Sequence, residues 1–171
     1  MATLRELKGR IGSVASSEKI TGAMKMISSA KMHRAEADLR RLLPFRSQIE
    51  TIIGNLLSAD AEFSSPLTEE REVKRVGIVV LGSDDGLCGG YNINIFKDLL
   101  VRLRECREKW GEDIDFTIFT VGRKIHKAVA KFVDHHITEV NDESVNSKCG
   151  PDVIKRFAGM LSDRFLSGEL D

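Results

Sequence analysis

The chain has 171 residues, and its 26 Lys and Arg residues are balanced by 26 Asp and Glu residues. This length predicts one domain, or one domain with an appendage. The zero net charge and the 6% aromatic content exclude a typical nucleic-acid-binding protein. The apolar runs are too short for a transmembrane segment, and the first residues lack the core of a signal peptide. Three widely spaced cysteines favour a reducing, cytosolic compartment.

Residues 1–58 predict one long coiled-coil-type helix. Apolar residues recur there in steps of three and four, with a break in register, at Leu4, Leu7, Ile11 and Val14, at Ile20, Met24, Ile27 and Ala30, and from Leu42 to Leu56. Such a helix would span roughly 80 Å. A domain of ~100 residues has a radius of gyration of about 13 Å and cannot cover it. Pro44 lacks a backbone N–H, so it predicts a kink or a split.

The charges are unevenly divided along the chain. Residues 1–58 have ten basic and five acidic side chains, a net charge of +5, and the remaining residues have 16 and 21, a net charge of −5. A basic segment favours a partner with a negative surface, and the alternative is a helix whose lysines and arginines are simply solvated. Because a lone helix cannot bury its apolar positions, we expect another helix beside it. That helix would come from a second copy, from a partner or from a part of this protein missing from the chain.

Residues 59–73 are polar and are interpreted as a linker, and residues 74–171 alternate predicted strands and helices. The predicted strands are Arg75–Leu81, which we expect to be buried on both faces, Phe116–Val121 and His136–Val140. Apolar residues mark helices over 93–110, 125–133 and 151–165, and Gly168 is expected to end the last of them. This alternation predicts an α/β, Rossmann-like three-layer domain with parallel strands. The sheet is expected to be incomplete, because a fourth strand would follow residue 171.

The glycine-rich turn Gly82–Gly90 follows the first predicted strand, where phosphate-binding loops often lie. It has no Gly-x-Gly-x-x-Gly or Gly-Lys-Ser/Thr motif, and Asp84 and Asp85 would repel a phosphate. The two aspartates could instead hold a divalent metal, but the favoured interpretation is that one caps the next helix and the other is solvated. Cys88 could be a nucleophile near a helix N-terminus, yet a small buried cysteine is favoured. The favoured interpretations therefore assign no catalytic residue, metal or cofactor to this turn.

Two motifs give the chain a specific resemblance. The segment Lys19-Ile20-Thr21-Gly22-Ala23-Met24-Lys25-Met26 resembles the core of the N-terminal shaft helix in gamma subunits of F-type, proton-translocating ATP synthases. The segment Ser83–Asn92 is similar to that family's Ser-Asp-Arg-Gly-Leu-Cys-Gly-Gly-Phe-Asn, with Asp85 in place of the usual basic residue. Weaker similarity continues through Val121–Lys124. The resemblance implies an N-terminal fragment, because the family's chains go on to complete the sheet and to add a C-terminal helix antiparallel to the first.

The resemblance also implies a function. The gamma subunit is the central-stalk rotor, which couples proton flow through the membrane ring to ATP synthesis or hydrolysis at the beta subunits and is not itself catalytic. The implied partners are the alpha and beta subunits, the epsilon subunit, the membrane-embedded c ring and the subunit's own C-terminal helix. The implied location is the cytoplasmic face of a bacterial inner membrane, held peripherally.

The resemblance assigns site residues by motif matching. Those in contact with the catalytic subunits would be Lys19, Ile20, Thr21, Ala23, Met24 and Met26. Those in the turn that joins the shaft to the globular domain would be Gly86, Leu87, Cys88 and Gly89. The residues themselves leave two alternatives open: a small α/β enzyme that uses Cys88 or the Asp84–Asp85 pair, and a coiled-coil adaptor that self-associates.

Overall fold

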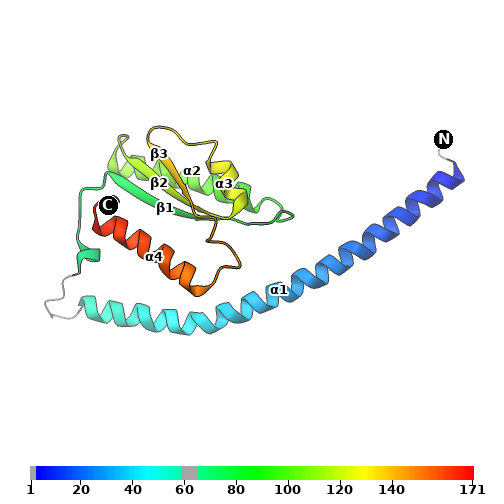
Figure 1. The fold of residues 1–171 in the computed structure, drawn as a ribbon, viewed down its shortest axis with the longest axis horizontal. Coiled ribbons are helices and arrows are strands. Elements are labelled where there is room, and N and C mark those ends of the chain that lie inside the picture. Colours follow the sequence, from blue (N-terminus) through cyan, green and yellow to red (C-terminus); the bar gives the residue numbers. More distant parts are fainter. Residues whose placement is uncertain (1–2, 59–64) are drawn as a thin grey trace. The chain divides into compact units, whose positions relative to one another are not determined.

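The computed structural model describes residues 3–58 and 65–171, and the chain divides into two compact units, residues 1–63 and 64–171. The first unit contains the helix α1, Leu4–Ser58, which continues without interruption through Pro44 (Figure 1). Thr3 and Glu6 form a capping box at its start: the Thr3 hydroxyl accepts from the Glu6 N–H, and the Glu6 carboxylate accepts from the Thr3 N–H. No residue of α1 is buried. The capping box therefore defines where this helix begins, and the apolar side chains of the helix are exposed to solvent.

The second unit is a three-stranded parallel sheet with helices on both faces, as predicted. The strands β1 (Arg75–Leu81), β2 (Asp115–Val121) and β3 (Ile137–Asn141) lie in the order β1-β2-β3. The helices α2 (Tyr91–Trp110) and α3 (Arg123–Val129) cover one face, and α4 (Pro151–Leu166) covers the other (Figure 1). A short 3-10 helix, η1 (Pro66–Thr68), precedes the sheet. The α/β prediction with parallel strands is confirmed.

The main core lies between the sheet and the helices α2 and α3. Side chains alternate along each strand, so Phe116 and Ile118 of β2 point to this face, while Phe119 points to α4, where its ring meets that of Phe157 edge-on. The buried residues of the cluster are Val80, Leu99, Leu103, Ile114, Phe116, Ile118, Ile125, Val129 and Ile137. This core fixes the strand ends, and thereby the loops that follow them.

The prediction that β1 is buried on both faces is wrong. Only Val80 of this strand is buried, and Val79 and Leu81 are 40% and 61% exposed. Among the described residues β1 is an edge strand, and its α4-side face is covered near Gly77, where the Leu170 side chain packs so closely that a Cβ on Gly77 would lie 2.9 Å from it. An apolar run predicts a strand, but it does not indicate how much of each face of that strand the neighbouring helices cover.

The largest difference between a predicted and an observed helix end is at the end of α3. The apolar pattern extended the second helix of the sheet region to Val133, but α3 ends at Val129. The Phe132 N–H bonds to the Val129 carbonyl at 2.7 Å, so a turn follows the helix. The carboxylate of Asp134 then accepts from the His136 N–H at 2.8 Å where the chain turns into β3. Gly168 ends the last helix as predicted, with a φ of 76°. The Glu169 N–H bonds to the Arg164 carbonyl at 2.9 Å, as in a Schellman motif.

One polar network interrupts the apolar core. The hydroxyl of Thr120, a buried residue of β2, donates to Oε1 of Glu139 on β3 at 2.7 Å. Nδ1 of His126 on α3 lies 2.8 Å from the same oxygen. The carboxylate thus joins two strands and one helix, and each partner reduces the cost of removing it from water.

Replacing Thr120 with Val should lower the free energy of unfolding by about 1–2 kcal/mol, because the buried carboxylate loses a donor while the shape is kept. Urea unfolding followed by the fluorescence of Trp110, the single tryptophan, measures it. Thr117→Val is the matched control on the opposite face of β2, and we expect a smaller change. Equal losses in the two variants would show that the network adds no stability.

Candidate functional site

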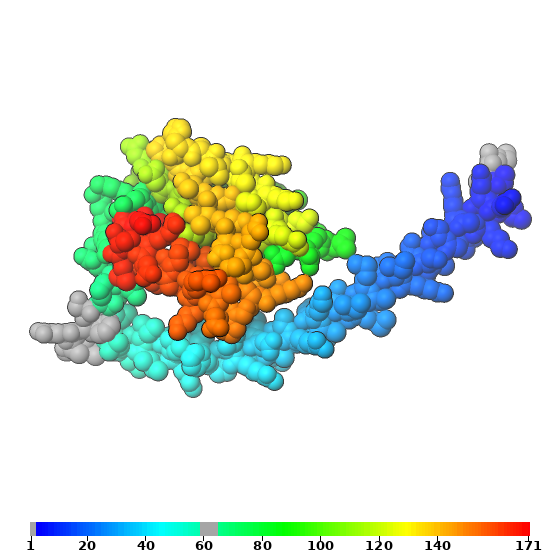
Figure 2. All heavy atoms as spheres, viewed as in Figure 1, coloured from blue at the N-terminus to red at the C-terminus, as the bar shows by residue number. Residues whose placement is uncertain are grey.

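The predicted shaft residues lie on the surface of α1. Ile20, Met24 and Met26 are 62%, 46% and 71% exposed, and Figure 2 shows the side chains of the helix projecting along its length. Helical spacing places Ile20, Ala23 and Met24 on one face, because they are three or four residues apart. Lys19 and Met26, seven residues apart, share a neighbouring face. The helix therefore offers a partner one apolar face, and beside it a face with a lysine and a methionine.

Thr21 differs from the other shaft residues. Its hydroxyl donates to the Ser17 carbonyl at 2.7 Å, one helical turn earlier. This bond occupies the hydroxyl proton locally and leaves the methyl group and the oxygen lone pairs for a partner. Thr21 is therefore suited to a packing contact more than to donating a hydrogen bond.

The glycine-rich turn begins where two backbones meet. Gly82 follows β1 and Gly122 follows β2, and the Gly82 N–H donates to the Val121 carbonyl at 2.7 Å. A Cβ on Gly122 would lie 2.7 Å from the carbonyl carbon and oxygen of Gly82, and a Cβ on Gly82 would lie 2.5 Å from Ile125. Only glycine fits at both positions. This close approach brings the turn Ser83–Gly90 next to the start of α3.

Ser83 and Asn92 hold the turn from its two ends. The Asn92 carbonyl oxygen accepts from the Ser83 N–H at 3.0 Å, and its amide nitrogen donates to the Ser83 hydroxyl at 2.8 Å. Leu87, in the middle, has a φ of 62° and is 92% exposed. A leucine in the left-handed region carries strain, so the network holds an apolar side chain in solvent where a partner can reach it.

Cys88 is half-buried within this network and is not the small buried cysteine that we favoured. Its sulfur accepts from the Asn92 amide at 3.1 Å and lies 3.5 Å from the Ser83 hydroxyl. Within residues 65–171 no histidine is among the hydrogen-bond partners of its thiol. The arrangement positions the turn, and it brings no general base to the sulfur.

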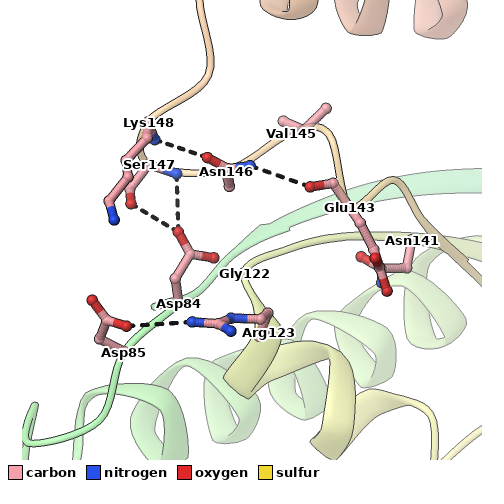
Figure 3. A pocket seen from close by; sticks show the side chains of 10 residues that line it. All are labelled: Asp84, Asp85, Gly122, Arg123, Asn141, Glu143, Val145, Asn146, Ser147 and Lys148. Carbon is pink, nitrogen blue, oxygen red and sulfur yellow. Dashed lines mark hydrogen bonds and ion pairs between the residues drawn. The ribbon is translucent and has the colours of Figure 1, made fainter.

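Asp84 binds the loop that follows β3, and Asp85 faces the first residue of α3. Neither caps α2, contrary to one half of the favoured interpretation, but Asp85 is exposed, as the other half expected. Oδ2 of Asp84 accepts from the N–H and the hydroxyl of Ser147, at 3.0 and 2.8 Å (Figure 3). These bonds hold the pKa of Asp84 below its ordinary value of 3.8. Oδ1 of Asp85 lies 3.4 Å from Nη2 of Arg123, in an exposed pair. The N-cap of α2 is Gly90, which has no side chain to accept a bond.

These links surround a polar pocket of about 330 Å³ at the carboxyl ends of the three strands (Figure 3). It is lined by Asp84, Asp85, Gly122, Arg123, Asn141, Glu143, Val145, Asn146, Ser147 and Lys148. Over the described ranges, 3–58 and 65–171, no three acidic, cysteine or histidine side chains converge as metal ligands. In the same ranges no helix has the length and apolar character needed to cross a membrane.

Asp84→Asn should reduce stability at neutral pH by no more than about 1 kcal/mol, because the carboxylate is only partly screened from water. The pKa of Asp84 is lowered on folding, so its contribution is present above the unfolded value of 3.8 and disappears as pH falls through the folded value. Urea unfolding of both proteins between pH 7 and pH 3 should therefore show a difference that shrinks on acidification. A constant difference would contradict the assignment.

The sequence comparisons identify the family. A profile described as ATP synthase matches residues 3–171. The ATP synthase gamma chain of Phocaeicola vulgatus is 47% identical over 131 residues, covering 77% of this chain and 45% of that protein. The gamma chain of Bacteroides thetaiotaomicron is 39% identical over 171 residues, covering all of this chain and 56% of that one. This chain belongs to the ATP synthase gamma-chain family. It spans about half the length of these curated relatives.

A solved structure has a similar fold to this chain. The rotor of the Euglena gracilis mitochondrial ATP synthase matches 92% of this chain and 52% of its counterpart, with a TM-score of 0.50 and 17% sequence identity. At this identity the likeness concerns the fold alone. The long helix followed by a parallel α/β sheet is therefore an arrangement shared with a chain of that rotor.

The structure adds residues that the motifs of the gamma-chain family did not single out. Ser147 holds Asp84 across 63 residues of sequence, and Arg123 faces Asp85, the position where this chain departs from the usual basic residue. Arg123 lies in the weakly similar segment Val121–Lys124, which offered a signal for it. Ser147 lies in a loop without any such signal. Asp85 thus lies opposite an arginine in this chain.

Proposed function

We propose that this chain is part of the central-stalk rotor of an F-type ATP synthase and couples proton flow through a membrane ring to ATP synthesis or hydrolysis. The match of residues 3–171 to the family carries this proposal. In it, α1 turns inside the ring of alternating alpha and beta subunits, and the globular unit binds the epsilon subunit and rests on the c ring. The complex would lie at the cytoplasmic face of a bacterial inner membrane.

The surface of α1 supports a place inside a ring of subunits. The helix has 55 residues and no buried ones, so its apolar side chains need surrounding protein. Residues 1–58 carry a net charge of +5, which suits an acidic surface on the beta subunits. Lys19 and the apolar residues Ile20, Ala23, Met24 and Met26 would make the contact, together with Thr21.

The globular unit is proposed to take no part in the chemistry of ATP. Asp84 and Asp85 are directed to Ser147 and Arg123, and the Cys88 sulfur to Ser83 and Asn92. The residues Gly86, Leu87, Cys88 and Gly89 form a supported turn, which we assign to the junction between shaft and globular domain. Hydrolysis and synthesis would then belong to the beta subunits, and this chain would transmit their motion.

The experiment is site-specific photo-crosslinking in the assembled complex. A benzophenone amino acid at position 24 should form an adduct with a catalytic subunit, and that adduct should abolish ATP hydrolysis because a rotor bound covalently to its surroundings cannot turn. The matched control carries the same amino acid at Glu112, an exposed position before β2. It should give no adduct with a catalytic subunit. An adduct at position 24 that leaves hydrolysis intact would refute the rotor assignment.

A further inference from the structure

The turn after β1 contains the one Asp-Gly pair of the chain, Asp85-Gly86, and the chain has no Asn-Gly pair. Among aspartyl residues, those before glycine isomerise most readily, because glycine has no Cβ to keep its amide nitrogen away from the preceding carboxyl group. In a folded protein the reaction also requires that this nitrogen and this carboxyl group are free to meet. The surroundings of the two groups therefore decide whether the pair is reactive.

The Gly86 nitrogen is free within the part of the chain that the structure describes. Its N–H donates to no acceptor there, whereas the Tyr91 N–H, at the other end of the turn, donates to the Cys88 carbonyl at 3.2 Å. Gly86 is exposed, and the nearest atoms to a Cβ at this position would be at the end of the Lys124 side chain, 3.9 Å away. The nitrogen can therefore approach the carboxyl group of Asp85 without breaking a hydrogen bond.

The carboxyl group of Asp85 is equally accessible, unlike that of its neighbour Asp84 (Figure 3). The Asp85 side chain is 82% exposed, and its ion pair with Arg123, at 3.4 Å, is a weak one because both partners are in solvent. Asp84 accepts two hydrogen bonds from Ser147, and the residue after it has a side chain that crowds its amide nitrogen. Reaction is therefore expected at Asp85 and not at Asp84.

We propose that Asp85 and Gly86 form a site of spontaneous isomerisation, at which the turn acquires an isoaspartyl residue. The Gly86 nitrogen attacks Cγ of the neutral Asp85 carboxyl group, and its proton leaves together with the hydroxyl group as water, which gives a cyclic succinimide. Water then adds to the main-chain carbonyl carbon of Asp85, and the bond from this carbon to the Gly86 nitrogen breaks. The nitrogen takes up a proton and stays bonded to Cγ. One water is released and one is consumed, so no atom is gained or lost.

Isomerisation would alter the shape of the turn. The Cβ of Asp85 becomes part of the main chain, which grows by one atom between Ser83 and Asn92. The Asp85 carbonyl, which accepts from the Ser83 hydroxyl at 2.9 Å, becomes a charged carboxylate outside the main chain. Leu87 holds its φ of 62° in a segment of fixed length, so the longer chain should release it. The reaction needs no partner and is independent of the rotor function proposed above.

The experiment compares the 171-residue chain folded in buffer and unfolded in urea, during long incubation at physiological temperature. Isoaspartate is counted as methyl groups transferred from S-adenosylmethionine by protein L-isoaspartyl methyltransferase, and its position is read from fragmentation of the tryptic peptide that contains Asp85. We expect the folded chain to react at Asp85 within about threefold of the unfolded rate, because no native hydrogen bond has to open first.

The chain supplies an internal control in the pair Asn146-Ser147. Asparagine before serine loses ammonia through the same cyclic intermediate, but the Ser147 N–H is held by the Asp84 carboxylate at 3.0 Å. Asn146 should therefore deamidate in urea and remain intact in the folded chain. The contrast between the two pairs separates the effect of local structure from the effect of sequence.

Two variants test the chemistry. Gly86→Ala should slow isomerisation roughly tenfold, which corresponds to about 1.4 kcal/mol in the activation barrier. The structure accommodates this alanine, because the φ of Gly86 lies outside the left-handed region and its surroundings are open. Asp85→Glu keeps the charge beside Arg123 but would have to form a larger ring, so its product should be undetectable. In the purified isoaspartyl form, amide exchange at Tyr91 should be faster than in the unmodified chain.

Four outcomes would overturn the proposal. Isoaspartate that forms at Asp85 in urea but not in the folded chain would show that the turn protects the pair. Isoaspartate at another residue with Asp85 unchanged would show that the site is misplaced. Equal rates in Gly86→Ala and the wild type would exclude attack by an unhindered Gly86 nitrogen. Unchanged exchange at Tyr91 in the isoaspartyl form would show that the turn keeps its shape.

Discussion

Gly122→Ala should lower the free energy of unfolding by roughly 3–5 kcal/mol, the sum of a strained backbone and a steric overlap. Gly122 has a φ of 110°, a conformation that side chains rarely adopt. Its Cβ would lie 2.7 Å from backbone atoms of Gly82, which cannot move away without breaking the 2.7 Å bond from Gly82 to Val121. Urea unfolding followed by Trp110 fluorescence measures the loss.

Gly159→Ala is the matched control for this prediction. Gly159 lies within α4, and a Cβ there would meet nothing within 4 Å. Alanine should raise the free energy of unfolding by about 0.5–1 kcal/mol, because it favours the helix more than glycine does. If Gly122→Ala proved as well tolerated as Gly159→Ala, the crossing of the two backbones after β1 and β2 would not be a close one.

The expected loss at Gly122 also has a functional side. The same crossing sets the position of the turn Ser83–Gly90 relative to α3, and Lys124 donates its N–H to the Ser83 carbonyl at 3.1 Å. A Cβ would push these loops apart and disturb the exposed side chain of Leu87. The turn should therefore lose its fixed conformation before the sheet unfolds, and amide exchange at Lys124 should quicken more than exchange at Ile118.

Sequence reasoning could predict the fold where apolar residues recur at regular spacing along the chain. A 3–4 spacing of apolar residues predicted α1 and α4, the nearly continuous apolar run 75–81 predicted β1, and Pro151 and Gly168 marked the ends of α4. The end of α3 was not accessible, because Phe132 and Val133 continued the apolar pattern while the backbone turns after Val129. The spacing of apolar residues indicates which side chains favour burial. A turn depends on single local hydrogen bonds, which that spacing does not indicate.

Sequence reasoning could locate only those parts of the candidate site that carry a motif. The shaft segment and the turn from Gly86 to Gly89 could be located, but their roles remain predictions. The partners of the turn could not be found, since Asp84 meets Ser147 across 63 residues. The bond from Arg71 to Phe165 spans 94. Contacts at such separations arise from the topology of the sheet, and no local pattern encodes them.

Met24→Lys should decrease ATP-driven proton pumping by the assembled complex roughly tenfold or more, because an ammonium group without a partner in a protein contact is costly to desolvate. Met24 is proposed to face the catalytic subunits from the same side of α1 as Ile20 and Ala23. The unfolding transition reported by Trp110 should not change, because the substitution lies in the other unit of the chain. Pumping in vesicles and urea unfolding of the same variant provide the two measurements.

Met32→Lys separates the contact from a general effect of charge on α1. Met32 lies on the same helix, is exposed, and stands outside the segment 19–26. The substitution adds the same charge, so it should reduce pumping much less than Met24→Lys if the contact is local. Equal losses would indicate that α1 responds to its total charge and would remove the assignment of Lys19, Ile20, Thr21, Ala23, Met24 and Met26. Unchanged pumping in Met24→Lys would remove it as well, because a lysine cannot enter a close apolar contact without cost.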